Sequence, residues 1–147
     1  MGDKTVFENR MEVSFLAKSE NEAFARVAVA AFVAQLNPTL AEAMEVKTAV
    51  SEAVTNAIIH GYDRMDGENM VRVECRIADK EVFIEIADQG MGIADIQQAI
   101  EPLYTSKPEM ERSGMGFTVM DEFMDGMEVV SQVGSGTTII LRKRIDG

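Results

Sequence analysis

The chain has 147 residues, which suits one domain with its own hydrophobic core, and its single cysteine, Cys75, cannot form an internal disulfide. Lys and Arg number 14 against 25 Asp and Glu, a net charge of -11, which argues against direct DNA or RNA binding because duplex binding depends on clustered basic side chains. No apolar stretch approaches the roughly 20 residues needed to cross a bilayer, and no N-terminal segment resembles a leader. We therefore expect one domain over residues 1–147, cytoplasmic and without membrane contact.

A strand and a helix are predicted at the start of the chain. Residues 11–15 alternate apolar and polar side chains, the period of a half-buried strand. Ser19 and Glu22 match a capping box that begins a helix, and Asn37-Pro38 ends it. Helical spacing predicts that Arg26 is exposed, opposite the buried face. That face is expected to comprise Phe24, Val27, Ala28, Ala31, Phe32 and Gln35.

A second helix is predicted from about Leu40 to His60, with Gly61 as its C-terminal cap. Its buried stripe comprises Val46, Val50, Ala53, Val54, Ala57 and Ile58. Strands over residues 71–77 and 82–86 then form a hairpin that continues into Asp88. Residues 88–112 are polar, glycine-bearing and long for a passive loop, so we expect a functional segment there.

The last predicted elements are a helix and two strands. Phe117, Met120, Phe123 and Met124 recur at helical spacing, and strands follow at 127–131 and 138–141. The order of elements predicts an α+β fold, a two-layer sandwich in which helices pack on one face of a mixed β-sheet.

Glu52 and Asn56 are four residues apart and project from one face of the second helix. The side-chain oxygen of Asn56 suits a hard cation such as Mg²⁺, and Glu52 can accept a proton from an attacking hydroxyl. Taken alone, the pair fits a solvated helix face better than a site.

Three glycine-bearing segments could also contact a nucleotide. Asp88 offers a carboxylate that can accept from the exocyclic amine of adenine, and Gly90 and Gly92 allow backbone to lie against a base and ribose. Residues 113–116 precede a helix, where backbone N–H groups hold phosphate oxygens. Residues 134–137 could place Thr137 beside a base or could form a plain hairpin turn. The Asp88 segment taken alone is more readily a glycine-rich turn.

Taken in order, these four patterns resemble the N, G1, G2 and G3 boxes of the GHKL superfamily (gyrase, Hsp90, histidine kinase, MutL), from about residue 40 to 144. The resemblance implies a Bergerat-type fold that binds ATP or ADP, with Asn56 on Mg²⁺ and Asp88 on adenine. It implies a nucleotide loop and lid over residues 88–116. The implied nucleotide contacts are Asn56, Asp88, Gly90, Gly92, Thr105, Ser106, Lys107, Arg112, Ser113, Gly114, Met115, Gly116, Phe117 and Thr137.

Within that superfamily, residues 19–36, SEAVTNAIIHGY from Ser51 and ERSGMGF from Glu111 resemble the anti-sigma F factors of spore-forming bacteria. The resemblance implies a homodimer that inhibits sigma factor F and phosphorylates a serine of an anti-anti-sigma partner. It makes Glu52 the general base and Arg26 a contact for both partners, within a partner and dimer region at residues 11–36. Residues 1–10, 63–69 and the C-terminal strands match less closely.

Two other functions remain open at this point. The chain could be a binding module in which ATP orders the lid and the partner surface without phosphoryl transfer. It could also be the detached catalytic domain of a sensor histidine kinase, although His60 is its only histidine and lies near a helix end. One histidine and one cysteine give almost no support to a zinc site.

Overall fold

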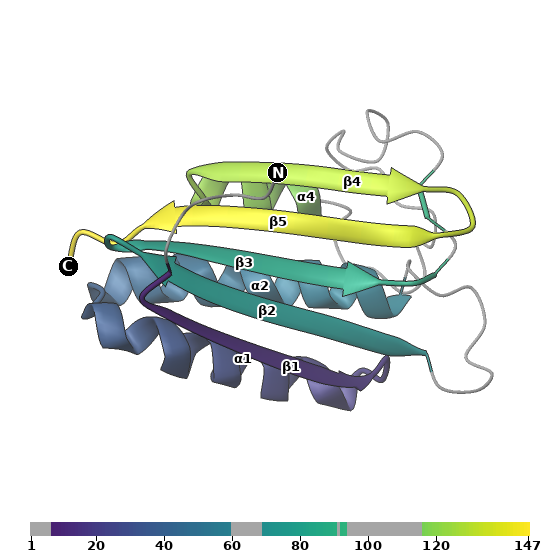
Figure 1. The fold of residues 1–147 in the computed structure, drawn as a ribbon, viewed down its shortest axis with the longest axis horizontal. Coiled ribbons are helices and arrows are strands. Elements are labelled where there is room, and N and C mark those ends of the chain that lie inside the picture. The colour runs from purple at the N-terminus through teal and green to yellow at the C-terminus, as the bar shows by residue number, and fades with distance from the viewer. Residues whose placement is uncertain (1–6, 60–68, 91, 94–115) are drawn as a thin grey trace.

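A computed structural model describes residues 7–59, 69–90, 92–93 and 116–147 of the chain (Figure 1). In chain order its elements are strand β1 (Asn9–Leu16), helix α1 (Glu20–Val33), 3-10 turn η1 (Ala34–Leu36), helix α2 (Leu40–Ile59), strands β2 (Met70–Ala78) and β3 (Glu81–Asp88), helix α4 (Gly116–Phe123), and strands β4 (Gly126–Gln132) and β5 (Gly136–Arg144).

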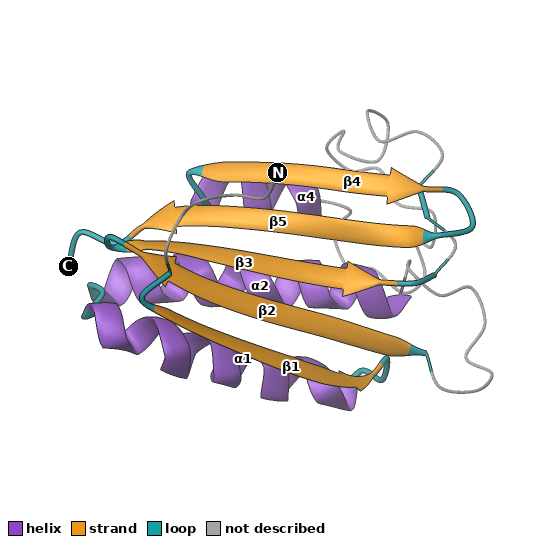
Figure 2. Cartoon of the chain, in the orientation of Figure 1, coloured by secondary structure: helices purple, strands orange, loops and turns teal. Residues whose placement is uncertain are grey.

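The five strands form one sheet in the order β1-β2-β3-β5-β4, and the helices cover one of its faces (Figure 2). The α+β class is confirmed. The sheet, expected to be mixed, is antiparallel in all four described pairings. Between β1 and β2 the reason is geometric, because two antiparallel helices return the chain to the end of the sheet that it left. Asp79 and Lys80 close the predicted β2–β3 hairpin with φ of 49° and 66°, as a tight two-residue turn requires.

The hydrophobic core lies between the sheet and α2, which packs between α1 and α4 (Figure 1). The predicted stripe of α2 is confirmed, because Val46, Val50, Ala53, Val54, Ala57 and Ile58 are all buried. Alternate residues of β2 and β3 are buried against it, as their two-residue period predicted. Met120 and Met124 of α4 are buried as well.

The predicted inner face of α1 is wrong. Its buried residues are Ala25, Val29 and Val33. Phe24 is 55% exposed and Val27 62% exposed, and Ala31 and Gln35 are exposed too. Of the predicted set, only Ala28 and Phe32 are half-buried. A small side chain at Ala25 allows α1 to approach the core closely, so the helix turns its larger apolar residues outward.

The predicted exposure of Arg26 is also wrong, because that side chain is half-buried. It is 39% exposed, and its Nε lies 3.2 Å from Glu22 Oε2, one turn earlier on α1. The distance allows an ion pair, yet neither atom has a partner at hydrogen-bonding geometry. The pair is therefore held by charge and not by a directed bond.

The capping box at Ser19 does not form, whereas one forms at the start of α2. Ser19 has helical dihedral angles and its side chain caps nothing. By contrast, the Thr39 N–H donates to Glu42 Oε1 at 2.9 Å, and the Glu42 N–H donates to Thr39 Oγ1 at 3.1 Å. The Glu42 carboxylate also accepts from the backbone N–H groups of Asp146 and Gly147, which holds the C-terminal residues against α2.

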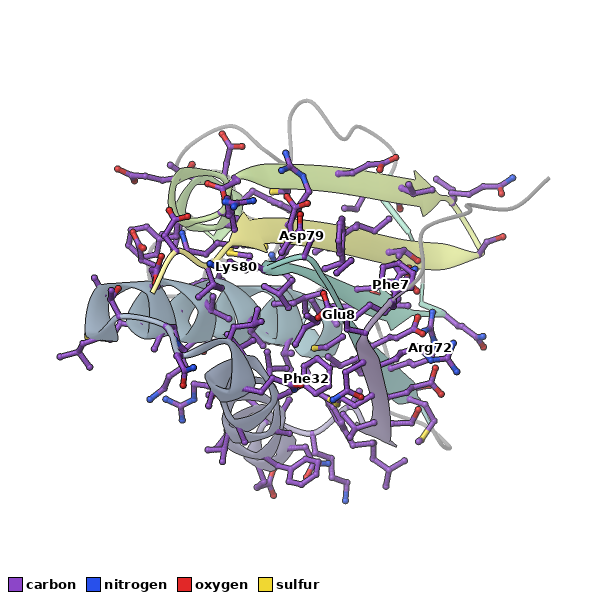
Figure 3. The ribbon with its side chains drawn as sticks, turned by 60° about the vertical axis from the view of Figure 1, so that its left-hand side comes forward. Phe7, Glu8, Phe32, Arg72, Asp79 and Lys80 are labelled. Carbon is purple, nitrogen blue, oxygen red and sulfur yellow. The ribbon has the colours of Figure 1, made fainter. Side chains whose placement is uncertain are left out.

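The sheet face away from the helices is polar. Arg72 lies on it, opposite the side on which Phe32 of α1 packs (Figure 3), and pairs with Glu12 at 3.4 Å and Glu85 at 2.5 Å. On the same face Phe7 meets the ring of Phe83, on the central strand β3, edge-on with centroids 5.9 Å apart. Arg72 and its partners therefore form a half-buried ion-pair network and leave the core to the opposite face.

Candidate nucleotide site

The site begins with Asp88, the last residue of β3, which is only 7% exposed. Its Oδ1 accepts from the Gly90 N–H at 2.9 Å and from the Thr137 N–H at 3.3 Å. Both hydrogen bonds that the described residues give to Asp88 end on Oδ1, so Oδ2 receives none from them. Burial raises the pKa of the carboxyl, and the two hydrogen bonds offset only part of that rise. A buried carboxylate of this kind is matched by a ligand that donates a hydrogen bond.

Two glycines with left-handed backbone bring the two turns of the site together. Gly92 has φ of 78° and Gly136 φ of 100°. A Cβ on Gly136 would overlap the carbonyl oxygen of Asp88, and one on Gly92 would overlap that of Gln132. The loop after β3 and the β4–β5 hairpin are therefore in direct backbone contact, which only glycine permits at these positions.

Ser131 of β4 connects the same two turns, and the sequence patterns did not identify it. Its Oγ accepts from the Ile93 N–H at 2.7 Å and lies 2.7 Å from Thr137 Oγ1. It also donates to the carbonyl oxygen of Gly136 at 3.2 Å. Ser131 and Thr137 are direct cross-strand neighbours. A polar residue opposite Thr137 in the predicted hairpin was the one sequence feature that could have identified it.

Glu52 and Asn56 are both half-buried on α2. The side-chain nitrogen of Asn56 is buried and has no hydrogen-bond partner. Rotating the amide by 180° exchanges its nitrogen and oxygen, so the same position can present an oxygen to a cation. Mg²⁺ in nucleotide sites takes one or two protein oxygens together with phosphates and waters. Asn56 therefore fits such an ion, and no cluster of three or more His, Cys, Asp or Glu side chains competes for it within the described ranges.

The structure brings several predicted residues to one end of the molecule. The C-terminal end of α2, the end of β3 and the β4–β5 turn all lie there (Figure 1). Asp88, Gly90, Gly92 and Thr137 come together, as their spacing in the boxes predicted. Gly116 is buried at the first turn of α4, and Phe117 packs beside the core. Thr105, Ser106, Lys107, Arg112, Ser113, Gly114 and Met115 lie outside the described residues, as do His60 and Gly61.

Comparison with known families sets the class of the domain. The sequence matches the family model of the histidine kinase-like ATPase domain over residues 15–143. The fold and the site thus define a histidine kinase-like ATPase domain, the class of ATP-binding domain that the four boxes predicted. None of the helices in the described part of the chain is long and apolar enough to span a membrane.

Relatives in spore-forming clostridia define the family more narrowly. The chain is 59% identical over 139 residues to the anti-sigma F factor of Clostridium beijerinckii, covering 95% of this chain and 96% of that protein. It is 58% identical over 139 residues to the anti-sigma F factor of Clostridium perfringens, covering 95% of this chain and 99% of the relative. The chain belongs to the anti-sigma F factor family.

Solved structures share the fold at low sequence identity. The RsbU and RsbW domains of Rv1364c from Mycobacterium tuberculosis superpose with a TM-score of 0.68 at 17% identity, over 93% of this chain and 32% of that one. The histidine kinase domain of the blue-light activated histidine kinase from Erythrobacter litoralis EL346 gives a TM-score of 0.58 at 15% identity, over 84% of this chain and 60% of that one. These likenesses confirm the fold.

Proposed function

We propose that this chain binds and inhibits sporulation sigma factor F, and that it uses Mg-ATP to phosphorylate a serine of its anti-anti-sigma partner. We place it in the cytoplasm as a homodimer, in which residues 11–36 form the partner and dimer region. The observation that carries the proposal is the buried Asp88 carboxylate, held on Oδ1 by Gly90 and Thr137, in a chain that belongs to the anti-sigma F factor family.

Asp88 would select the base. Its Oδ2 accepts no hydrogen bond from the described residues, and an exocyclic amine is a donor of the matching polarity. Burial raises the pKa of this carboxyl, so its charged form is less favourable in the fold than in water, and a hydrogen-bond donor on the base would stabilise it. Gly90 and Gly92 keep the adjoining backbone free of side chains, so that it can lie against the nucleotide.

Glu52 and Asn56 would serve the transfer. Bound Mg-ATP supplies the phosphoryl group and the cation that shields its charge. Asn56, whose side-chain nitrogen has no hydrogen-bond partner, would hold that cation, and Glu52, one turn earlier on α2, would orient the serine hydroxyl and accept its proton. In the lid and the following turn, Thr105, Ser106, Lys107 and Arg112, together with Ser113 to Phe117, would hold the phosphates.

The transfer is tested by incubating the purified chain with γ-labelled ATP, Mg²⁺ and the candidate anti-anti-sigma protein, followed by mapping of the labelled residue. We expect one labelled serine, lost in Asp88→Asn. Glu52→Gln should lose transfer and keep its ADP affinity, whereas Glu128→Gln, an exposed carboxylate on β4, should keep both. Transfer by Glu52→Gln at the wild-type rate would remove the general base from the proposal.

The same assay separates the two other functions. ADP binding without any labelled protein would favour a binding module that uses ATP only as a ligand. Label on histidine of an added receiver and histidine domain would favour a sensor kinase fragment.

The proposed binding of sigma factor F is tested at Arg26. Its side chain is 39% exposed and lies on α1 near the exposed Phe24 and Val27. Arg26→Ala should weaken capture of sigma factor F and leave ADP affinity unchanged. The matched control is Arg10→Ala, which removes another arginine that pairs with a glutamate, on the sheet instead of the helix. Equal sigma affinity in the two variants would exclude Arg26 from the interface.

A further inference from the structure

The side chain of Ser131, like that of Asp88, hydrogen-bonds to both turns of the site. On one side its Oγ accepts from the Ile93 N–H, in the loop that follows β3. On the other side it reaches Thr137 Oγ1 and the Gly136 carbonyl, in the β4–β5 hairpin. Thr137 in turn donates its backbone N–H to Asp88 Oδ1. Ser131 therefore fixes both segments that position the Asp88 carboxylate, without touching that carboxylate itself.

The hydrogen-bond capacity of a hydroxyl limits how the protons of this network can be arranged. A serine hydroxyl has one proton and two lone pairs. In the 2.7 Å contact between Ser131 and Thr137 either hydroxyl could be the donor. If Ser131 gives its one proton to the Gly136 carbonyl, 3.2 Å away, it uses one lone pair for the Ile93 N–H and the other for the Thr137 hydroxyl. Every capacity of Ser131 is then used. In that arrangement the proton of Thr137 points at Ser131, so Thr137 Oγ1 keeps only lone pairs for any further contact.

The arrangement gives Thr137 the same polarity as Asp88. Both side chains are then hydrogen-bond acceptors, and their backbone positions are linked by the Thr137 N–H bond to Oδ1. Two neighbouring acceptors favour a ligand edge that carries an amine and disfavour one that carries a carbonyl oxygen, because unmatched acceptors lose solvation without gaining a bond. Losing the Ser131 hydroxyl frees Thr137 to donate as well as accept, and it releases the Ile93 N–H.

We propose that Ser131 is a positioning residue for base selection, which makes the site prefer purine nucleotides with a 6-amino group over those with a 6-oxo group. The inference rests on the proposed nucleotide site at Asp88 and goes beyond it by assigning a selectivity role to β4. Ser131 would act through Thr137 and the Gly92–Ile93 backbone, so its effect should depend on which group the base presents at position 6.

The test compares ADP with IDP, which has a carbonyl oxygen in place of the amine, by titration calorimetry with Mg²⁺ present. We expect wild type to prefer ADP. In Ser131→Ala the ADP affinity should fall about tenfold, the scale of one or two net hydrogen bonds, and the IDP affinity should change less than about threefold. Ser131→Thr, which keeps the hydroxyl, should retain the preference. So should Ser135→Ala, the same substitution in the exposed turn of the hairpin.

The outcomes separate this inference from the proposed function. A wild-type chain that binds neither nucleotide would overturn the nucleotide site and this inference together. A wild-type chain that prefers ADP, with Ser131→Ala keeping that preference or losing both affinities equally, would overturn only the role of Ser131. The unfolding midpoint of each variant without nucleotide is measured alongside. The positioning role of Ser131 would be established if Ser131→Ala is folded but binds ADP and IDP equally, and if Ser131→Thr again prefers ADP.

Discussion

Gly136 links the geometry of the β4–β5 turn to the nucleotide site, and a matched glycine two residues earlier makes that link testable. A Cβ at Gly136 would overlap the Asp88 carbonyl oxygen and lie 2.7 Å from the Cα of Gln89. At Gly134, a Cβ would have no atom within 4 Å. Both glycines have positive φ, 100° and 85°. Alanine is therefore strained at both positions, but only Gly136→Ala must displace the end of β3.

The expected magnitudes follow from these two effects. A residue other than glycine in the left-handed region costs about 1–2 kcal/mol. Overlap with a packed backbone adds about 1–3 kcal/mol. Gly134→Ala should then lower the free energy of unfolding by about 1–2 kcal/mol, and Gly136→Ala by about 2–5 kcal/mol. Because the displaced atoms belong to Asp88 and Gln89, only Gly136→Ala should also weaken ADP binding, by about tenfold or more, as expected when one site hydrogen bond is lost.

Urea unfolding followed by circular dichroism gives the stabilities, and titration calorimetry gives the ADP affinities. Two variants with unfolding free energies within about 0.5 kcal/mol of each other, and with equal ADP affinity, would refute the argument, since that difference is the usual scale of a neutral substitution. If the two variants differ in unfolding free energy but bind ADP equally, the steric clash at Gly136 is supported and its effect on the Asp88 site is rejected.

Three further predictions concern single side chains. Asp88→Asn should unfold at a higher temperature than wild type at pH 7 without nucleotide, because burial raises the pKa of Asp88 and its negative charge therefore disfavours the folded state. This gain in unfolding temperature should vanish as the pH falls below 3.8, the ordinary pKa of an aspartate, where Asp88 is neutral in both states. Hydrogen bonds from the Thr39 N–H and next the Asp146 N–H lower the pKa of Glu42 in the folded state. The ionised Glu42 therefore stabilises the fold fully above pH 4.5, the ordinary pKa, and this stabilisation is lost as the pH falls through the lowered pKa of the folded state. Urea titrations should show the difference in unfolding free energy between wild type and Glu42→Gln closing over that pH range. Lys143→Met should lower the free energy of unfolding by about 1–3 kcal/mol, because the buried Nζ donates to the Phe123 carbonyl and pairs with Glu45, while the exposed control Lys47→Met should change it by less than about 0.5 kcal/mol.

The sequence predicted α2 and the hairpin strands correctly because their apolar residues follow a single period. Helix α1 differs, since its alanines, valines and phenylalanines surround most of its circumference. Periodicity alone then does not identify the buried face. The prediction assumed that the larger side chains face the core, and it therefore selected the wrong face. Contact with α2 and the sheet selects the stripe Ala25, Val29 and Val33 instead. Local spacing alone does not contain that information.

The two candidate capping boxes show the same limit. Ser19 and Thr39 each stand three residues before a glutamate, and only Thr39 forms the box. Asn37, in the left-handed region with φ of 53°, interrupts the helical backbone before Thr39. Ser19 instead lies in a turn in which the Asn21 N–H donates to the Lys18 carbonyl, and its backbone is already helical. The backbone preceding the serine or threonine decides whether the box forms.

The grouping of Asp88 with Thr137 was predictable because the order of the boxes identifies both residues. Ser131 was not, because its role depends on the pairing register of β4 and β5. A hairpin turn one residue longer or shorter would place a different side chain opposite Thr137 and turn Ser131 to the other face of the sheet. Sequence patterns thus identify the residues that meet the nucleotide more readily than the residues that position them.

The unpartnered side-chain nitrogen of Asn56 supports the choice of this end of the fold as the site. Among the described residues, four buried side-chain atoms have no hydrogen-bond partner, those of Glu22, Arg26, Asn56 and Arg76. Arg76 is on the sheet and lies over the ring of Phe7, at 4.9 Å from its centre. Glu22 and Arg26 form an ion pair with each other on α1, with their charged atoms 3.2 Å apart. Asn56 belongs to the last turn of α2, at the end where β3 presents the buried Asp88 (Figure 1). At the opposite end, the Glu42 carboxylate accepts from the backbone of Asp146 and Lys143 donates to the Phe123 carbonyl. A fold with an unmatched buried polar group is stabilised by binding a molecule that matches it.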